Sequence, residues 1–268
     1  MIRNIALGQY YPADSPLHRM DPRTKILIIT VFIIILFITR GFLGYALLAA
    51  LSVSSIMVSR VPVKLIYRSL RPIVFILVFT VLLHLFMTKG EVLFRIGPLT
   101  ATWEGARQGA FMATRLVLLI MTTSLLTLTT SPIALTDGLE LLLKPFARLG
   151  VPAHELAMMM TIALRFIPTL LEEAEKIMKA QMARGADFQS GNVVARAKSL
   201  VPLLVPLFVS AFRRADELAM AMEARCYRGG EKRTRMKELT LTTVDWIATA
   251  VFAAFVVGSL VVSFGFRG

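Results

Sequence analysis

The sequence contains few of the residues and motifs on which most catalytic sites and metal sites depend. Its 268 residues include a single cysteine, Cys226, so no disulfide framework forms within the chain. The three histidines (His18, His84 and His154) lie far apart, outside any H-E-x-x-H motif or cysteine pair, which excludes the common zinc signatures. A G-x-x-x-x-G-K-[ST] motif is also absent, so we expect no P-loop nucleotide site. These absences predict a protein that is not an enzyme and holds no metal and no cofactor.

Charge is missing from long stretches of the chain. Three runs without Asp, Glu, Lys or Arg, each about 20 residues long, match the length that a helix needs to cross a bilayer core: Gly41–Ser59, Leu116–Thr136 and Trp246–Phe266. Two shorter runs, Ile26–Thr39 and Ile73–Thr88, are flanked by basic side chains that can reach the lipid headgroups. Hydrophobic residues make up 56% of the chain and its mean hydropathy is +0.69. We therefore predict an all-α polytopic membrane protein with about five transmembrane helices.

Basic residues gather on one side of these predicted spans. The segment before the first span and the loop 60–71 are basic, whereas the loop 89–107 is nearly balanced. Because cytoplasmic loops carry the excess of Lys and Arg, we predict that the N-terminus is cytoplasmic. The net charge of +13 could also indicate nucleic-acid binding, but topology and anionic lipid headgroups explain it in so apolar a chain. We expect a lipid bilayer, and no nucleic acid, among its partners.

A charged segment separates the fourth predicted span from the last one. Residues 131–242 contain 16 basic and 12 acidic residues, which predicts a cytoplasmic helical region between an N-terminal membrane domain of four spans (1–130) and a C-terminal transmembrane helix (243–268). The apolar stretches Leu156–Leu171 and Leu200–Phe212 lie inside this region. Arg165 and three prolines interrupt them, so we expect partly embedded or protein-buried helices rather than further spans.

The charged segment contains a repeat. Helical signals predict a first helix from Ser131-Pro132 to Gly150, followed by two long arms at Ala153–Arg184 and Val193–Arg225. When the Ala-Arg end of the first arm is aligned with the Ala-Arg end of the second, residues of similar character also align upstream. One arginine at a helix C-terminus needs no function, because it complements the helix dipole. Two equivalent arginines, each after an alanine, favour a paired docking function in which a guanidinium meets carboxylates on a partner.

Four short stretches follow one another along the chain: Ser15-Pro16-Leu17-His18-Arg19-Met20-Asp21-Pro22-Arg23-Thr24-Lys25, Ala163-Leu164-Arg165-Phe166-Ile167-Pro168, Ala183-Arg184-Gly185 and Ala224-Arg225-Cys226. In this order they resemble the transmembrane T component of energy-coupling factor (ECF) transporters, the group that includes the cobalt-transport Q subunits. The resemblance covers most of the chain. The last motif ends in cysteine instead of glycine, but we expect its arginine to make the contact.

The resemblance implies a membrane scaffold with long cytoplasmic coupling helices. In such transporters the two Arg motifs dock on two ABC-type ATPase subunits (a homodimer or a heterodimer), which bind the ATP. A small membrane-embedded S component captures a vitamin or a metal ion. Carried over to this chain, the predicted ATPase-docking residues are Ala183, Arg184, Gly185, Ala224, Arg225 and Cys226. The resemblance also implies the cytoplasmic (inner) membrane of a bacterium or an archaeon.

Methionines are frequent, with 14 in the chain. Seven lie on the arms: Met158, Met159, Met160, Met178, Met182, Met220 and Met222. Ordinary apolar packing explains such residues, but flexible methionine-rich surfaces also accept varied partners, so we predict these seven as candidate contacts for S components. Two other functions stay open on the residues alone. A conventional permease would need polar groups along its spans, and a lipid enzyme would need an acidic or histidine cluster at the membrane face.

Overall fold

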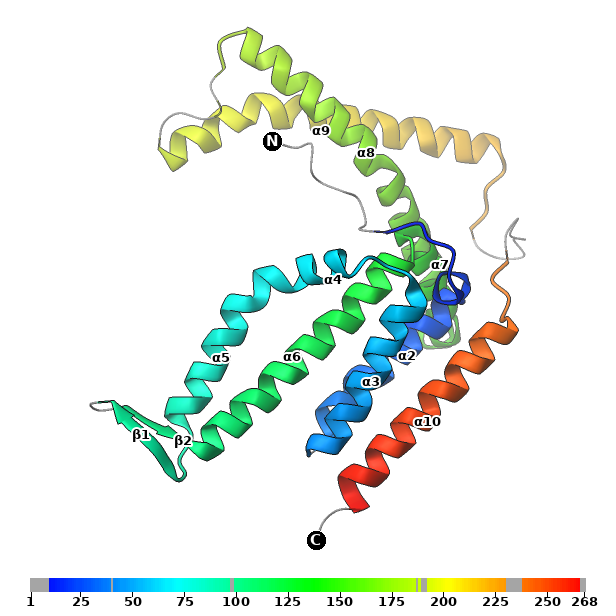
Figure 1. Ribbon diagram of the computed structural model, residues 1–268. Helices are drawn as coiled ribbons and strands as arrows, with labels where there is room; N and C mark the ends of the chain where they lie inside the picture. Colours follow the sequence, from blue (N-terminus) through cyan, green and yellow to red (C-terminus); the bar gives the residue numbers. More distant parts are fainter. Residues whose placement is uncertain are drawn as a thin grey trace. The chain divides into compact units, whose positions relative to one another are not determined.

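The computed structural model describes residues 10–39, 41–96, 99–186, 188, 192–229 and 238–265 (Figure 1). Its elements in chain order are α1 (Pro16–Arg19), α2 (Pro22–Ile38), α3 (Phe42–Ser59), α4 (Val63–Leu70), the 3₁₀ turn η2 (Arg71–Ile73), α5 (Val74–Met87), β1 (Val92–Ile96), β2 (Leu99–Thr102), α6 (Trp103–Thr129), α7 (Pro132–Leu143), η3 (Lys144–Leu149), α8 (Ala153–Ala183), α9 (Val193–Ala224) and α10 (Thr243–Gly265). Two compact units result. We call the one that contains Glu140–Lys237 the arm unit, and the one formed by Gly8–Leu139 and Glu238–Gly268 the membrane unit.

Helices form where the sequence offers start and stop signals. The Asp21 carboxylate accepts a hydrogen bond from the backbone N–H of Arg23 at 2.8 Å, and Pro22 opens α2. α3 ends at Ser59, and its C-cap, Arg60, adopts the left-handed conformation with φ 55°. These bounds agree with the first two predicted spans to within a few residues.

The fourth span differs from its prediction. We expected Leu116–Thr136, because that run lacks charge, but α6 runs from Trp103 to Thr129. Its start is fixed by Thr102, whose hydroxyl accepts a hydrogen bond from the backbone N–H of Gly105 at 3.1 Å. The remainder of the predicted run belongs to α7. An antiparallel hairpin of β1 and β2 precedes α6, and the sequence analysis did not predict it.

Arg115 lies in the part of α6 that precedes the uncharged run. Its Nη2 and Nε donate hydrogen bonds to the hydroxyl of Tyr45 at 2.6 Å and 2.9 Å. Its guanidinium carbon also lies 5.0 Å from the ring centroid of Phe37. The charge is therefore satisfied by a hydroxyl and an aromatic face from α3 and α2, so a helix can include it inside the membrane.

Among the described residues, five helical stretches are long and apolar enough to cross a membrane: Phe42–Ser59, Val63–Met87, Trp103–Thr129, Ala153–Ala183 and Thr243–Ser263. The count agrees with the predicted five, but the membership differs. α8 is included because its first half is apolar nearly all round, whereas α2 has only 17 residues. In both assignments the chain is a multi-pass, all-α membrane protein.

The core of the membrane unit lies between α2, α3, α6 and α10. It consists of Phe32, Ile35, Leu36, Tyr45, Leu48, Leu51, Leu118 and Phe252. By contrast, α5 has no buried residue and lies along α6, where a Cβ on Gly109 would stand 3.3 Å from the Cα of Val81. Glycine therefore lets these two helices approach closely. The exposed apolar side chains of α5 are those expected of a helix that faces lipid.

Three segments meet at one end of the membrane unit. The backbone N–H of Asp21 donates to the carboxylate of Asp245 at 2.8 Å, which links the start of α2 to the start of α10. The Lys25 ammonium donates to the carbonyl of Thr129 and the hydroxyl of Thr130, each at 3.0 Å, which links α2 to the end of α6. The stretch of residues 15–25 singled out in the sequence is thus a structural junction.

Candidate functional site: two arms with arginine tips

The two arms end at the predicted residues. α8 ends at Ala183 with Arg184 as its C-cap, and α9 ends at Ala224 with Arg225 as its C-cap. All four residues are exposed. The side chains of the two arginines make no hydrogen bond or ion pair within the part of the chain that the structure describes.

Both arms also end in the same backbone motif. In α8 the N–H of Ala186 donates to the carbonyl of Gln181 at 3.0 Å, and in α9 the N–H of Tyr227 donates to the carbonyl of Met222 at 3.1 Å. These bonds are those of the Schellman cap, which closes a helix through a left-handed residue. The two donors occupy equivalent positions when the arms are aligned at their arginines, and so do the two acceptors. The repeat seen in the sequence is therefore a repeat of structure.

The left-handed residue of each cap is the third residue of each Arg motif. Gly185 has φ 88° and Cys226 has φ 56°. Cysteine thus occupies a conformation that favours glycine, and the chain direction after each arginine is the same in both arms. The change from glycine to cysteine leaves the geometry of the second motif intact.

The arms run antiparallel and contact one another along their length. The Tyr227 hydroxyl donates to the Met158 sulfur at 3.0 Å, near the start of α8. Farther along α8, Arg214 Nη2 donates to Glu173 Oε2 at 2.7 Å. Gln181 of α8 donates to the carbonyl of Pro202 of α9 at 3.4 Å. As the residue number rises in α8 it falls in α9, and Figure 1 shows the two helices crossing.

This arrangement places the two arginine tips on opposite sides of the crossing. Arg184 follows Glu173 in the first arm by the same interval as Arg225 follows Arg214 in the second. At a rise of about 1.5 Å per residue, each tip lies about 16 Å beyond the crossing pair along its own helix. Two equivalent cationic tips at equal distances from one centre suit a partner with two equivalent binding grooves.

Comparison with known proteins identifies the family of the chain. The CbiQ family, described as cobalt transport protein, matches residues 13–236. The chain belongs to this family.

Relatives that cover nearly the whole chain share a transporter name. The "energy-coupling factor transporter transmembrane protein EcfT" of Thermosediminibacter oceani is 63% identical over 263 residues, which is 98% of this chain and 99% of the relative. The protein of the same name from Heliobacterium modesticaldum is 58% identical over 257 residues (96% and 97%). That of Bacillus subtilis is 51% identical over 258 residues (96% of each). The resemblance inferred from the sequence is confirmed, and this CbiQ-family chain is a membrane transport protein and not an enzyme.

Over the part of this CbiQ-family chain that the structure describes, cysteine, histidine and acidic side chains do not converge on a metal site. Within the described residues, no three of them are close enough to hold an ion. His84 bonds through Nδ1 with the carbonyl of Thr80, one turn back in its own helix, at 2.9 Å. His154 bonds with a Glu140 carboxylate oxygen at 3.0 Å and with the Tyr227 hydroxyl at 3.3 Å. This chain of contacts ties the residue after the second Arg motif to the base of the first arm.

The arm methionines divide by exposure. Met159, Met182 and Met220 are exposed, while Met158, Met160, Met178 and Met222 are half-buried. The largest exposed apolar side chains of the arms are instead on α9, where Phe208 is 61% and Phe212 is 68% exposed. Both lie in the apolar stretch Leu200–Phe212, for which the sequence predicted a partly embedded or protein-buried helix. Their exposure adds them to the surface that a partner can contact.

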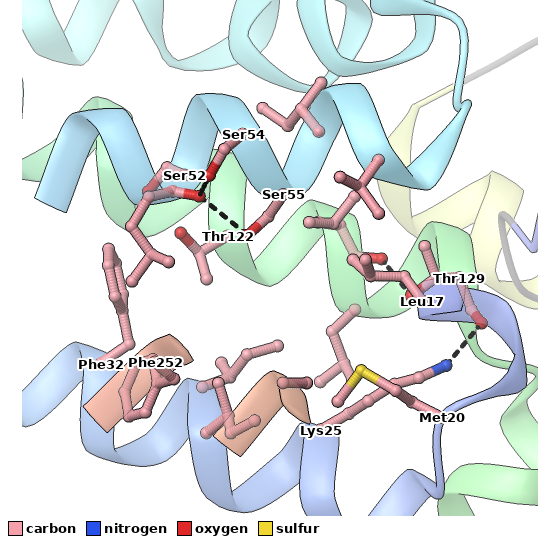
Figure 2. A pocket seen from close by; sticks show the side chains of 18 of the residues that line it. Leu17, Met20, Lys25, Phe32, Ser52, Ser54, Ser55, Thr122, Thr129 and Phe252 are labelled. Carbon is pink, nitrogen blue, oxygen red and sulfur yellow. Dashed lines mark hydrogen bonds between the residues drawn. The ribbon is translucent and has the colours of Figure 1, made fainter. Parts of the chain in front are cut away.

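One cavity of about 330 Å³ lies in the membrane unit, between α1, α2, α3, α6 and α10 (Figure 2). Its wall is mostly apolar. The hydroxyls of Ser54 and Ser55 both donate to the carbonyl of Leu51 in the same helix. Lys25, at one end, is engaged by Thr129, as Figure 2 shows. Since these polar groups are already paired, the cavity presents apolar surface and not a lining for a polar solute.

Proposed function

We propose that this chain is the transmembrane scaffold and energy-coupling component of an ECF-type ABC importer. The observation that carries the proposal is the pair of exposed, identically capped arginine tips, Arg184 and Arg225, on antiparallel arms. The names of the relatives support the transporter class. Each tip would insert its guanidinium between carboxylates in a groove of one ABC-type ATPase subunit, with small neighbours that permit close approach.

The ATPase subunits would bind the ATP, and this chain would hold no cofactor. Their motion would pass through α8 and α9 to a membrane-embedded S component that captures a vitamin or a metal ion. The exposed side chains of the arms, including Met159, Met182 and Met220, are the surface that we assign to that contact. The assembly would lie in the cytoplasmic membrane of a bacterium or an archaeon, with the arm tips in the cytoplasm.

Charge reversal of the tips tests this function. The variants R184E, R225E and R184E/R225E are expressed with the ATPases and an S component, and both ATPase co-purification and substrate uptake are measured. We expect the double variant to reach the membrane but to lose the ATPases or their coupled uptake. The matched control is R213E, which reverses an exposed arginine on α9 away from either tip and should keep both.

Unchanged ATPase association and uptake in R184E/R225E would refute the proposal. A conventional permease is less well supported, because the hydroxyls around the cavity donate to their own helix backbone. The experiment also separates that function, since a permease that forms its own substrate path gives no special role to both tips.

A further inference from the structure

The contact between Glu173 and Arg214 occupies a special place in the repeat. Their sequence separation is 41, the same interval that separates Arg184 from Arg225, so each is the counterpart of the other. In two antiparallel copies related by a local twofold axis, a residue meets its own counterpart only where that axis passes. The 2.7 Å ion pair between them therefore marks the axis about which the two arms are related.

A residue on such an axis faces the equivalent residue of the other arm, so the two side chains must be compatible in charge. If both arms had kept the same charged residue there, two like charges would face each other and repel. The first arm has Glu172-Glu173 where the second has Arg213-Arg214. At the next two positions the arms agree in character, with Ala174 matching Ala215 and Glu175 matching Asp216, whereas the exposed Lys176 matches the exposed Glu217. The charge of the repeat is thus reversed at the point where the arms meet.

The pair is sheltered more than an ordinary surface ion pair. The side chain of Glu173 is 23% exposed and that of Arg214 is 37% exposed, whereas Glu172 and Arg213 are exposed. The Ser210 side chain, one helical turn before Arg214, also interacts with the Glu173 carboxylate. Within the described residues, the Arg214 Nε is buried and has no hydrogen-bond partner. Among the same residues, the guanidinium donates through Nη2 to Glu173. Loss of Glu173 would leave a sheltered cation without an acceptor.

We propose that the Glu173–Arg214 ion pair is the positioning contact that sets the register of the arm crossing and so holds the two arginine tips at equal distances from it. The pair touches neither ATP nor substrate; it acts through Arg184 and Arg225. This inference rests on the proposed function of the tips, because equal spacing matters only if both must engage their partners together. It adds a specific ion pair on which coupling depends.

A charge swap tests the pair against a matched control. The test variants are E173R, R214E and the swap E173R/R214E. The control variants, E172R, R213E and E172R/R213E, make the same changes one position earlier in each arm, where the side chains are exposed. E173Q is added because it removes the charge with little change of shape, in case a reversed charge prevents folding.

Tip spacing is measured separately from transport. Spin labels are placed at the exposed, equivalent positions of K179C and M220C in a C226G background, and their distance distribution is recorded in the complete transporter. Uptake is measured in unlabelled variants that keep Lys179, Met220 and Cys226. We expect E173R and R214E to shift or broaden that distribution and to lower uptake roughly tenfold, because like charges then oppose each other at a sheltered contact. E173Q should fall between them and the parent. The swap should restore the distribution and most of the uptake, and the control set should stay close to the parent.

The positioning role would be overturned if E173R and R214E left the distance distribution and the uptake unchanged. It would also be overturned if the swap restored the distribution and the uptake no better than the single variants do. If that happens while R184E/R225E still abolishes uptake, only the positioning inference fails. If R184E/R225E also transports normally, the proposed function fails with it.

Discussion

At the scale of single residues, Cys226 stands where the backbone favours glycine. Its φ of 56° puts the Cβ of an L-residue close to a backbone carbonyl, which costs about 1 kcal/mol relative to glycine. The equivalent residue of the first arm, Gly185, has the same handedness without that cost. The second arm therefore keeps the shape of the cap at a small loss of stability.

Replacing Cys226 by glycine should accordingly stabilise the arm. We expect C226G to raise the free energy of unfolding by about 1 kcal/mol, measured as a higher thermal midpoint in detergent, with uptake unchanged. The reciprocal variant G185A should lower the midpoint; a Cβ there meets no atom within 4 Å, so only backbone strain would be added. A C226G variant that lost uptake would show that the thiol itself contributes to docking.

At the scale of elements, Asp21 joins two of them. Its carboxylate caps α2 and pairs with the Arg23 guanidinium at 2.7 Å, while its backbone N–H binds Asp245 of α10. Burial alone would raise the pKa of Asp21, but the hydrogen bonds and positive charge of Arg23 outweigh it and hold that pKa below its ordinary value. A carboxyl group of this kind stabilises the folded state above its unfolded pKa, and the contribution is lost as the pH falls through the lower folded pKa.

The stabilising effect of Asp21 should therefore disappear in acid. We expect D21N to lower the thermal midpoint at pH 6 and the difference from the parent to shrink as the pH is taken down to about 3, since the ordinary Asp pKa is near 4. The control is D14N, because Asp14 is exposed and its ion pair with Arg19 lies at the surface. A D21N deficit that stayed constant with pH would rule out the ionised carboxylate as its cause.

The sequence predicted these elements to different degrees, for physical reasons. Local signals at Pro132, Gly185 and the ends of α8 and α9 depend on neighbouring residues, so the arm boundaries were predicted within one or two positions. The fourth span was misplaced because Arg115 counts as a boundary until Tyr45, 70 residues away, supplies its partner. The Glu173–Arg214 pair likewise depends on how two helices cross. A repeat suggests such a contact only once the arms are known to be antiparallel.

At the scale of the whole molecule, the membrane unit gathers its basic segments at one end. Arg60, after α3, donates to the carbonyl of Asp14 in the N-terminal segment at 3.4 Å, and Tyr11 donates to the carbonyl of Leu128 at the end of α6 at 2.9 Å. The hairpin of β1 and β2 joins the far ends of α5 and α6. The N-terminal segment, the loop after α3 and the end of α6 thus share one side, and the excess of Lys and Arg there favours the cytoplasm.

Labelling of single cysteines by a membrane-impermeant maleimide tests this orientation in a C226G background. We expect K89C, next to the hairpin, to react in intact cells, and K64C, after α3, to react only in inverted vesicles. K179C, near the first tip, decides the course of α8. If α8 stays on the cytoplasmic side, as the docking function requires, K179C reacts only in inverted vesicles together with K64C. Labelling of K179C from outside would mean that α8 crosses the bilayer, and it would separate Arg184 from any cytoplasmic ATPase.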